Sequence, residues 1–142
     1  MTPKQIALVQ ETFAEIAPIA DQAAALFYQR LFTLDPSVRP LFRTELKGQG
    51  KKLMATLALV VNGLDRPEQI VAAVRHLGER HVGYGVQAHD YETVGAALLW
   101  ALAQGLGDTF TDEVENAWSA AYAMLAELMS HAAARVETAH GL

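Results

Sequence analysis

The 142-residue chain is 51% hydrophobic and 19% charged, which suits one globular domain with a single sizeable core. Its net charge is −5, from 11 basic and 16 acidic residues, and this acidic balance argues against a general nucleic-acid-binding surface. The chain has no cysteine, which excludes disulfides, thiolate metal sites and a cysteine nucleophile.

The N-terminal residues mix apolar with polar side chains and lack a cleavable signal pattern. The apolar run 57–61 ends at Asn62, far short of the roughly 20 residues that span a bilayer. We therefore expect a cytoplasmic protein that has neither a membrane nor a nucleic acid as its partner.

Two helices are predicted in the first third of the chain. Thr2 is a good helix cap, Pro3 suits the first turn, and Gln5 completes a capping box. The apolar stripe of this first helix ends near Pro18 and contains Ile6, Val9, Phe13 and Ile16. A second helix begins near Asp21, and its apolar side carries Ala24, Phe27, Tyr28, Leu31 and Phe32.

A corner is predicted after the second helix. A short helical turn covers residues 35–42, and the polar stretch 43–50 contains Gly48 and Gly50, which favour a break in the helix. The next helix is expected to begin near Gln49. Its inward side carries Leu53, Leu57, Val60 or Val61, and Leu64.

Three further helices are predicted in the second half. A stop-and-start signal at 65–68 leads into a helix over 70–81. An alanine-rich helix over about 90–106 points Val94, Leu98, Ala101 and Leu102 inward. A last helix from Thr111 or Asp112 buries Val114, Trp118, Ala121, Leu125 and Leu128.

Fraying is expected beyond Arg135, and both Trp100 and Trp118 are expected in the core. No β pattern or repeat is present. The sequence therefore predicts an all-α domain of roughly seven helices that spans residues 1–142.

His81 is the first candidate for chemistry. At about 100° per residue it shares one helical face with Ile70, Val74 and Leu77. A histidine there is a core residue with a satisfied ring, a metal ligand or an acid–base group, and the pattern leaves these open. The other histidines offer no second ligand at metal spacing, so a metal on His81 would bring most of its ligands with a cofactor. A haem does this, because it supplies four nitrogens and needs one axial histidine.

Other side chains are expected to converge on the same space. Tyr28 has the apolar spacing of the second helix, Phe42 lies at the corner, and Gln49 shares a face with Leu53. A buried hydroxyl or amide without a hydrogen-bond partner costs about 1–3 kcal/mol, so a tyrosine and a glutamine inside the domain both need partners. Taken singly, each of these residues is more often an ordinary one: Tyr28 a buried tyrosine, Gln49 a surface glutamine near a helix start, and Phe42 a core aromatic residue.

Taken in order and spacing, these residues resemble a bacterial globin, specifically the haem domain of flavohaemoglobins and their single-domain relatives. The resemblance covers Thr2 to about Arg135. Its marks are Leu26-Phe27-Tyr28, Phe32, Pro36, Leu41-Phe42, Gln49 with Leu53, His81, Tyr91 with Val94-Gly95, and Trp118 with Tyr122.

The resemblance implies a globin fold around one haem b (iron protoporphyrin IX). It implies that His81 is the proximal iron ligand and that the ring of Phe42 stacks on the haem. Tyr28 and Gln49 would be the distal polar pair, and Leu53 the apolar distal wall. The remaining cofactor contacts would be Leu57, Tyr84, Val86, Tyr91, Val94 and Leu98.

The chain departs from the flavohaemoglobin pattern in two places. It ends at Leu142 with no flavin- and nicotinamide-binding reductase, so we expect any redox cycle to use a separate reductase. Tyr91 matches the tyrosine that the family places near the proximal histidine, but Ala133 stands where the family has a glutamate. Glu137 lies a turn further on. We therefore expect no strong electron donation from the proximal side.

Three functions are compatible with this set. The first is reversible, high-affinity O2 binding, with Tyr28 and Gln49 as hydrogen-bond donors worth about 1.5–3 kcal/mol to a charged acceptor. The second is a nitric oxide dioxygenase in which the same two residues are catalytic. The third, which the short chain disfavours, is a gas or sulfide sensor or a haem-free signalling module. NO or CO would enter the same pocket, and the protein would be a monomer or a homodimer.

Overall fold

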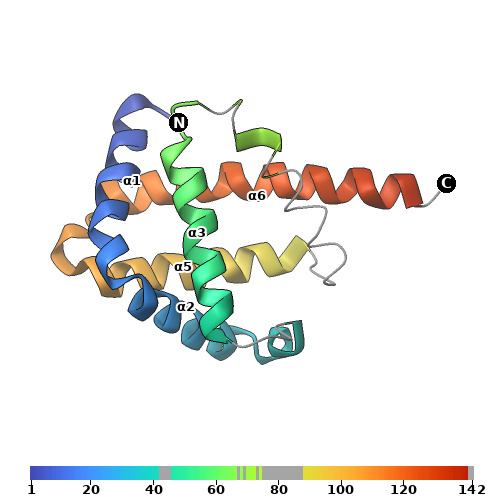
Figure 1. Cartoon of the computed structure of the whole chain (residues 1–142), viewed down its shortest axis with the longest axis horizontal. Coiled ribbons are helices and arrows are strands. Elements are labelled where there is room, and N and C mark those ends of the chain that lie inside the picture. The colour runs from blue at the N-terminus through green and yellow to red at the C-terminus, as the bar shows by residue number, and fades with distance from the viewer. Residues whose placement is uncertain (42–45, 67, 69, 73, 75–87, 141–142) are drawn as a thin grey trace.

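The computed structural model describes residues 1–41, 46–66, 68, 70–72, 74 and 88–140 (Figure 1). Every regular element among them is helical, which confirms the predicted all-α class. The elements are α1 (Pro3–Ile16), η1 (Ala17–Ile19), α2 (Ala20–Leu34), η2 (Pro36–Leu41), α3 (Leu46–Asn62), α5 (Ala88–Leu106), η3 (Gly107–Thr109) and α6 (Asp112–His140), the η elements being short 3-10 helices.

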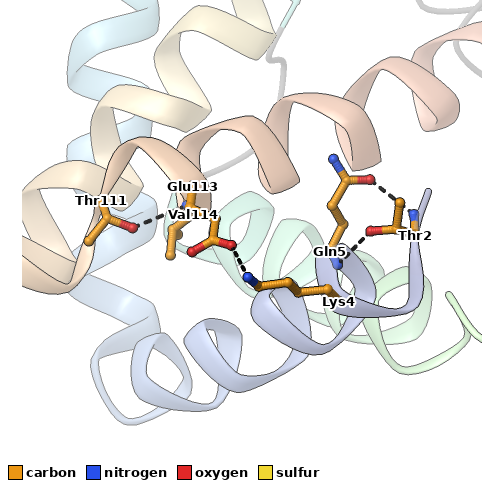
Figure 2. A network of polar contacts seen from close by, with 6 residues as sticks. All are labelled: Thr2, Lys4, Gln5, Thr111, Glu113 and Val114. Carbon is orange, nitrogen blue, oxygen red and sulfur yellow. Dashed lines mark hydrogen bonds and ion pairs between the residues drawn. The ribbon is translucent and has the colours of Figure 1, made fainter.

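The start of α1 follows the predicted capping box (Figure 2). The Gln5 amide donates to the Thr2 hydroxyl at 3.1 Å, and the Thr2 amide donates to the Gln5 side chain at 3.0 Å. One turn of helix therefore begins with two of its otherwise unpaired amides satisfied. Lys4 then pairs with Glu113 at 2.6 Å, which ties the exposed edge of α1 to the first turn of α6.

The first and last helices of the chain are neighbours in the fold. α1 packs against α6, while α2 packs against both α5 and α3. In Figure 1, α5 and α6 run side by side across the view and α3 crosses in front of them. The largest fully buried side chains are Val9, Ile16, Leu31, Ile70 and Val74. Ile70 and Val74 are both 2% exposed, so this part of the predicted apolar face of residues 70–81 is confirmed.

One buried hydrogen bond joins α1 to α6 inside this core. The indole Nε1–H of Trp118 donates to the Thr12 hydroxyl at 2.9 Å, and that hydroxyl donates in turn to the Leu8 carbonyl at 2.6 Å. Both side chains are almost completely buried, at 2% and 3% exposure. The core prediction for Trp118 is confirmed, and its one polar atom is satisfied.

The predicted corner at 43–50 is wrong over its second half, because α3 begins at Leu46 rather than near Gln49. Gly48 and Gly50 therefore lie inside a helix, although glycine costs about 1 kcal/mol relative to alanine there. Gly50 has a packing reason: a Cβ at this position would lie 3.0 Å from the Cβ of Ala24 in α2. Close approach of two helices outweighs the weak local preference against glycine.

Two other expectations also differ from the structure. The helical backbone of α6 continues to His140, past the expected fraying point at Arg135, through an alanine-rich sequence with high helix propensity. Trp100 packs against the core but is only partly buried, and the guanidinium of Arg30 lies over its ring at 5.3 Å from the centroid.

Candidate functional site

Tyr28 lies deep in the molecule, at 6% exposure on the inner side of α2. Its ring meets Phe27 edge-on at 5.0 Å and stacks with Phe32 at 6.0 Å. Burial raises the pKa of the Tyr28 hydroxyl from 10.0 to about 12, because the phenolate would lose its hydration. The hydroxyl therefore keeps its proton at every physiological pH and can donate a hydrogen bond.

Gly50 lets α3 approach α2 at the level of this tyrosine. A Cβ on Gly50 would contact the Tyr28 ring at 3.9 Å, besides the tighter approach to Ala24. Gln49, the preceding residue of α3, is partly buried. The two predicted distal residues thus come from helices that cross closely, and Gly50 makes that crossing possible. Sequence reasoning assigned Gly50 only to a turn; a glycine one residue from the candidate glutamine was the available signal.

Apolar residues of α3 and α5 lie beside this crossing. Leu57 and Leu98 are buried, at 7% and 6% exposure, whereas Leu53 is half-buried. All three line one small internal cavity between α1, α2, α3 and α5. Val94, one turn before Leu98, is half-buried. The structure therefore brings three predicted apolar contacts together.

The start of α5 is held by α6. The Tyr122 hydroxyl donates a 2.6 Å hydrogen bond to the main-chain carbonyl of Tyr91. The ring of Tyr122 lies directly over Gly95, where a Cβ would come within 2.7 Å of it. Burial raises the pKa of both tyrosines. The nearby carboxylate of Asp90 raises the pKa of Tyr91 further, and Tyr91 in turn raises the pKa of Tyr122. Sequence reasoning gave Tyr122 no role at this site. Its contact with Gly95 joins two different helices, so only the three-dimensional structure reveals it.

Four predicted site residues, Phe42, His81, Tyr84 and Val86, lie outside the described residues, as does the side chain of Ala133. Within the described part of the chain, no three His, Cys, Asp or Glu side chains gather as a metal site would require. In that same part, no helix has the length and apolarity needed to cross a membrane.

Comparison with known proteins gives a consistent result. The family model described as Globin matches residues 25–129. The flavohemoprotein of Bordetella pertussis is 32% identical over 91% of this chain, and that of Deinococcus radiodurans is also 32% identical over 91% of it. This chain spans about a third (33%) of the length of each of these relatives.

A solved structure superimposes over essentially the whole chain. It is an engineered carbene transferase made from a Rhodothermus marinus protein assigned as a nitric oxide dioxygenase. The TM-score is 0.91 at 28% identity, and the match covers 100% of this chain and 99% of the other. The helices described above are therefore arranged as in this solved structure over the whole length of the chain.

Proposed function

Because the chain belongs to the globin family, we propose that it holds a haem b group and binds O2 reversibly between α2 and α3. The relatives imply a haem cofactor, and haem b with O2 as the ligand is our proposal. Its iron ligand would be His81 and its stacking aromatic residue Phe42, as the resemblance implies.

The described residues fit such a group. Leu53, Leu57 and Leu98 offer the apolar contacts that a porphyrin requires, and the protonated Tyr28 hydroxyl offers a polar contact on one side. When bound, the haem iron supplies the coordination position for a diatomic gas. The protein residues orient that gas, donate hydrogen bonds to it and exclude water from around it.

The observation that carries the proposal is the buried phenol of Tyr28 beside the Gln49–Gly50 turn of α3. A ligand that carries partial negative charge is stabilised by donors in such a poorly hydrated place, by about 1.5–3 kcal/mol for one hydrogen bond. Two donors, the Tyr28 hydroxyl and the Gln49 side-chain amide, therefore favour O2 over CO, which is the less polarised gas. Slow O2 release is the expected consequence.

Stopped-flow measurement of O2 dissociation tests this. Tyr28→Phe removes only the hydroxyl, and we expect O2 to dissociate at least tenfold faster. Gln49→Leu should also accelerate release, whereas Gln29→Leu on the exposed side of α2 serves as the matched control and should not. A change below about threefold for Tyr28→Phe would contradict the role of this residue, and a purified protein without a haem absorbance band would contradict the whole proposal.

The solved structure, whose parent protein is assigned as a nitric oxide dioxygenase, favours a second candidate function, oxidation of nitric oxide to nitrate. The balanced reaction is NO + O2 + e⁻ → NO3⁻, and the electron would come from a separate flavin reductase. Tyr28 and Gln49 would then hold O2 while NO attacks it. Sustained NO consumption over many turnovers, with a reductase and NADH supplied, would establish this activity; a single stoichiometric burst would indicate O2 binding alone.

A further inference from the structure

One face of α5 lies at the surface of the molecule. Glu92 and Ala96 are exposed there, and Trp100 is partly buried. These three residues are spaced by four positions, so they form one row along the helix, which we call the α5 row. With a rise of about 1.5 Å per residue, Glu92 and Trp100 lie roughly 6 Å along the helix axis on either side of Ala96. The α5 row therefore has a small residue at its centre and a carboxylate at one end.

The other end of the α5 row carries the opposite charge, which comes from α2. The guanidinium of Arg30 lies over the ring of Trp100, 5.3 Å from its centroid. Arg30 is only partly buried, but its Nε atom is buried and has no hydrogen-bond partner within the described residues. Neither Arg30 nor Glu92 has an ion pair in that part of the chain. Because an unpaired charged donor is costly, a carboxylate from a second molecule would be stabilised beside Arg30.

Apolar side chains flank the α5 row. Leu34 lies one turn after Arg30 on α2 and is 42% exposed. Leu99 and Ala103, which lie next to the row on α5, are also only partly buried. A protein interface typically combines such apolar contacts with a few charged groups at its edge. The surface formed by the α5 row and the adjoining part of α2 has this composition.

A two-fold axis through Ala96 would make this surface complementary to itself. In a symmetric contact, residue i meets residue j of the partner and residue j meets residue i. With the two copies of Ala96 against each other, Glu92 of the partner subunit reaches the Arg30–Trp100 pair, and Glu92 of this chain reaches the same pair on the partner. Two attractive charge contacts form at once. The small side chain of Ala96 lets the two helices approach closely between them.

We propose that this surface is the interface of a symmetric homodimer, in which the α5 helices of two copies pack antiparallel across Ala96. A second copy is the occupant that the charges favour, because it carries a carboxylate and a guanidinium at the required positions by symmetry. An unrelated partner would have to match both charges separately. The inference is independent of the proposed function, since no haem contact enters it.

Sedimentation equilibrium of the purified full chain tests the proposal. We expect the wild type to approach twice the monomer mass of 15.4 kDa as its concentration rises toward about 1 mM. Ala96→Arg brings two arginines together on the axis, so the dimer dissociation constant should rise by at least about tenfold. Ala55→Arg on the exposed side of α3 is the matched control and should leave the constant unchanged. A wild type that stays monomeric throughout, or an Ala96→Arg dimer as tight as the wild type, would overturn the inference.

A charge exchange identifies the pair that meets across the axis. Glu92→Arg places arginine against Arg30 of the partner subunit, and Arg30→Glu places glutamate against Glu92 of the partner subunit, so each variant alone should dimerise at least about tenfold more weakly. Mixing the two variants restores opposite charges at both contacts, and native mass spectrometry should then show mainly the mixed dimer.

This mixture separates a contact between subunits from a change within one chain. A mixture that forms no more dimer than its separate components would overturn the pairing of Arg30 with Glu92. Circular dichroism checks that each variant folds. Should Arg30→Glu not fold, the comparison of Ala96→Arg with Ala55→Arg decides the question by itself.

Discussion

The hydroxyl of Tyr122 in α6 reaches the main-chain carbonyl of Tyr91 in the first turn of α5, at 2.6 Å. A side chain of α6 thereby fixes the backbone of α5 near the start of that helix. The glycine at position 95 makes room for the ring that carries this hydroxyl. The junction of α5 and α6 is therefore defined by three residues that depend on one another.

Tyr122→Phe should lower the free energy of unfolding by about 1 kcal/mol, the usual net value of one intramolecular hydrogen bond. The phenylalanine ring keeps the packing over Gly95, so only the hydrogen bond is lost. Urea unfolding followed by circular dichroism measures the difference. An unchanged unfolding midpoint would mean that the bond contributes nothing to stability.

Gly95→Ala should be more damaging than Tyr122→Phe. Its new methyl group would lie 2.7 Å from the Tyr122 ring, so helices α5 and α6 must separate or the ring must turn. We expect a loss of about 1–3 kcal/mol, which is the range for overpacked cores. Combining it with Tyr122→Leu, which removes the ring, should recover part of the loss, and a strictly additive double variant would contradict the contact.

Thr12→Val should destabilise the protein by about 1–3 kcal/mol, although valine has nearly the same shape as threonine. The change leaves the indole N–H of Trp118 buried without an acceptor. Thr12→Ser retains the hydroxyl and is the control, which should keep most of this contribution. Chemical unfolding of both variants separates the hydrogen bond from the packing; equal losses would show that the missing methyl or the altered shape dominates.

Gly48→Ala and Gly50→Ala form a matched pair in one helix. No atom lies within 4 Å of a Cβ at Gly48, so alanine there should stabilise the protein by up to about 1 kcal/mol. Gly50→Ala has the same helical benefit, but its Cβ approaches that of Ala24 at 3.0 Å, so we expect no gain or a loss. Under the proposed function, O2 dissociation should change in the Gly50 variant alone. Equal stabilisation by both substitutions would mean that α2 and α3 yield easily at their crossing.

Alkaline pH should destabilise the fold through its buried tyrosines. Burial raises the pKa of Tyr28 from 10.0 to about 12, so the folded protein holds a proton that the unfolded chain releases between these two values. The stability due to the neutral phenol is complete below pH 10 and is lost as the pH rises toward 12. At pH 11 the loss from Tyr28 alone is about 1 kcal/mol.

Burial shifts the pKa of Tyr91 and Tyr122 in the same upward direction, so they add to this alkaline loss. Unfolding midpoints at pH 8 and pH 11 measure the total. The Tyr28→Phe variant should lose less stability over this interval than the wild type does. Parallel losses in the two proteins would show that Tyr28 ionises as readily in the folded as in the unfolded state.

Local sequence patterns predict much of the fold, because amphipathic spacing and caps are local properties of a helix. The stripe from Val9 to Ile16 and the capping box at Thr2 are both present as predicted. The sequence does not predict the start of α3, because Gly48 and Gly50 locally favour a break in the helix. The close packing of α2 against Gly50 is a tertiary contact that no local pattern contains. Tyr122 is similar, since its partner lies 31 residues away in a different helix. The roles of Tyr28, Gln49 and His81 came from resemblance and stay predictions.

The Thr12–Trp118 hydrogen bond also bears on how the chain is made. Its two partners are separated by 106 positions, and both belong to the packed α1–α6 pair. A nascent chain leaving the ribosome exposes the apolar side of α1 long before α6 has been synthesised. Final closure of this core must therefore wait until α6 has been synthesised, and until then the apolar side of α1 lacks the helix that buries it.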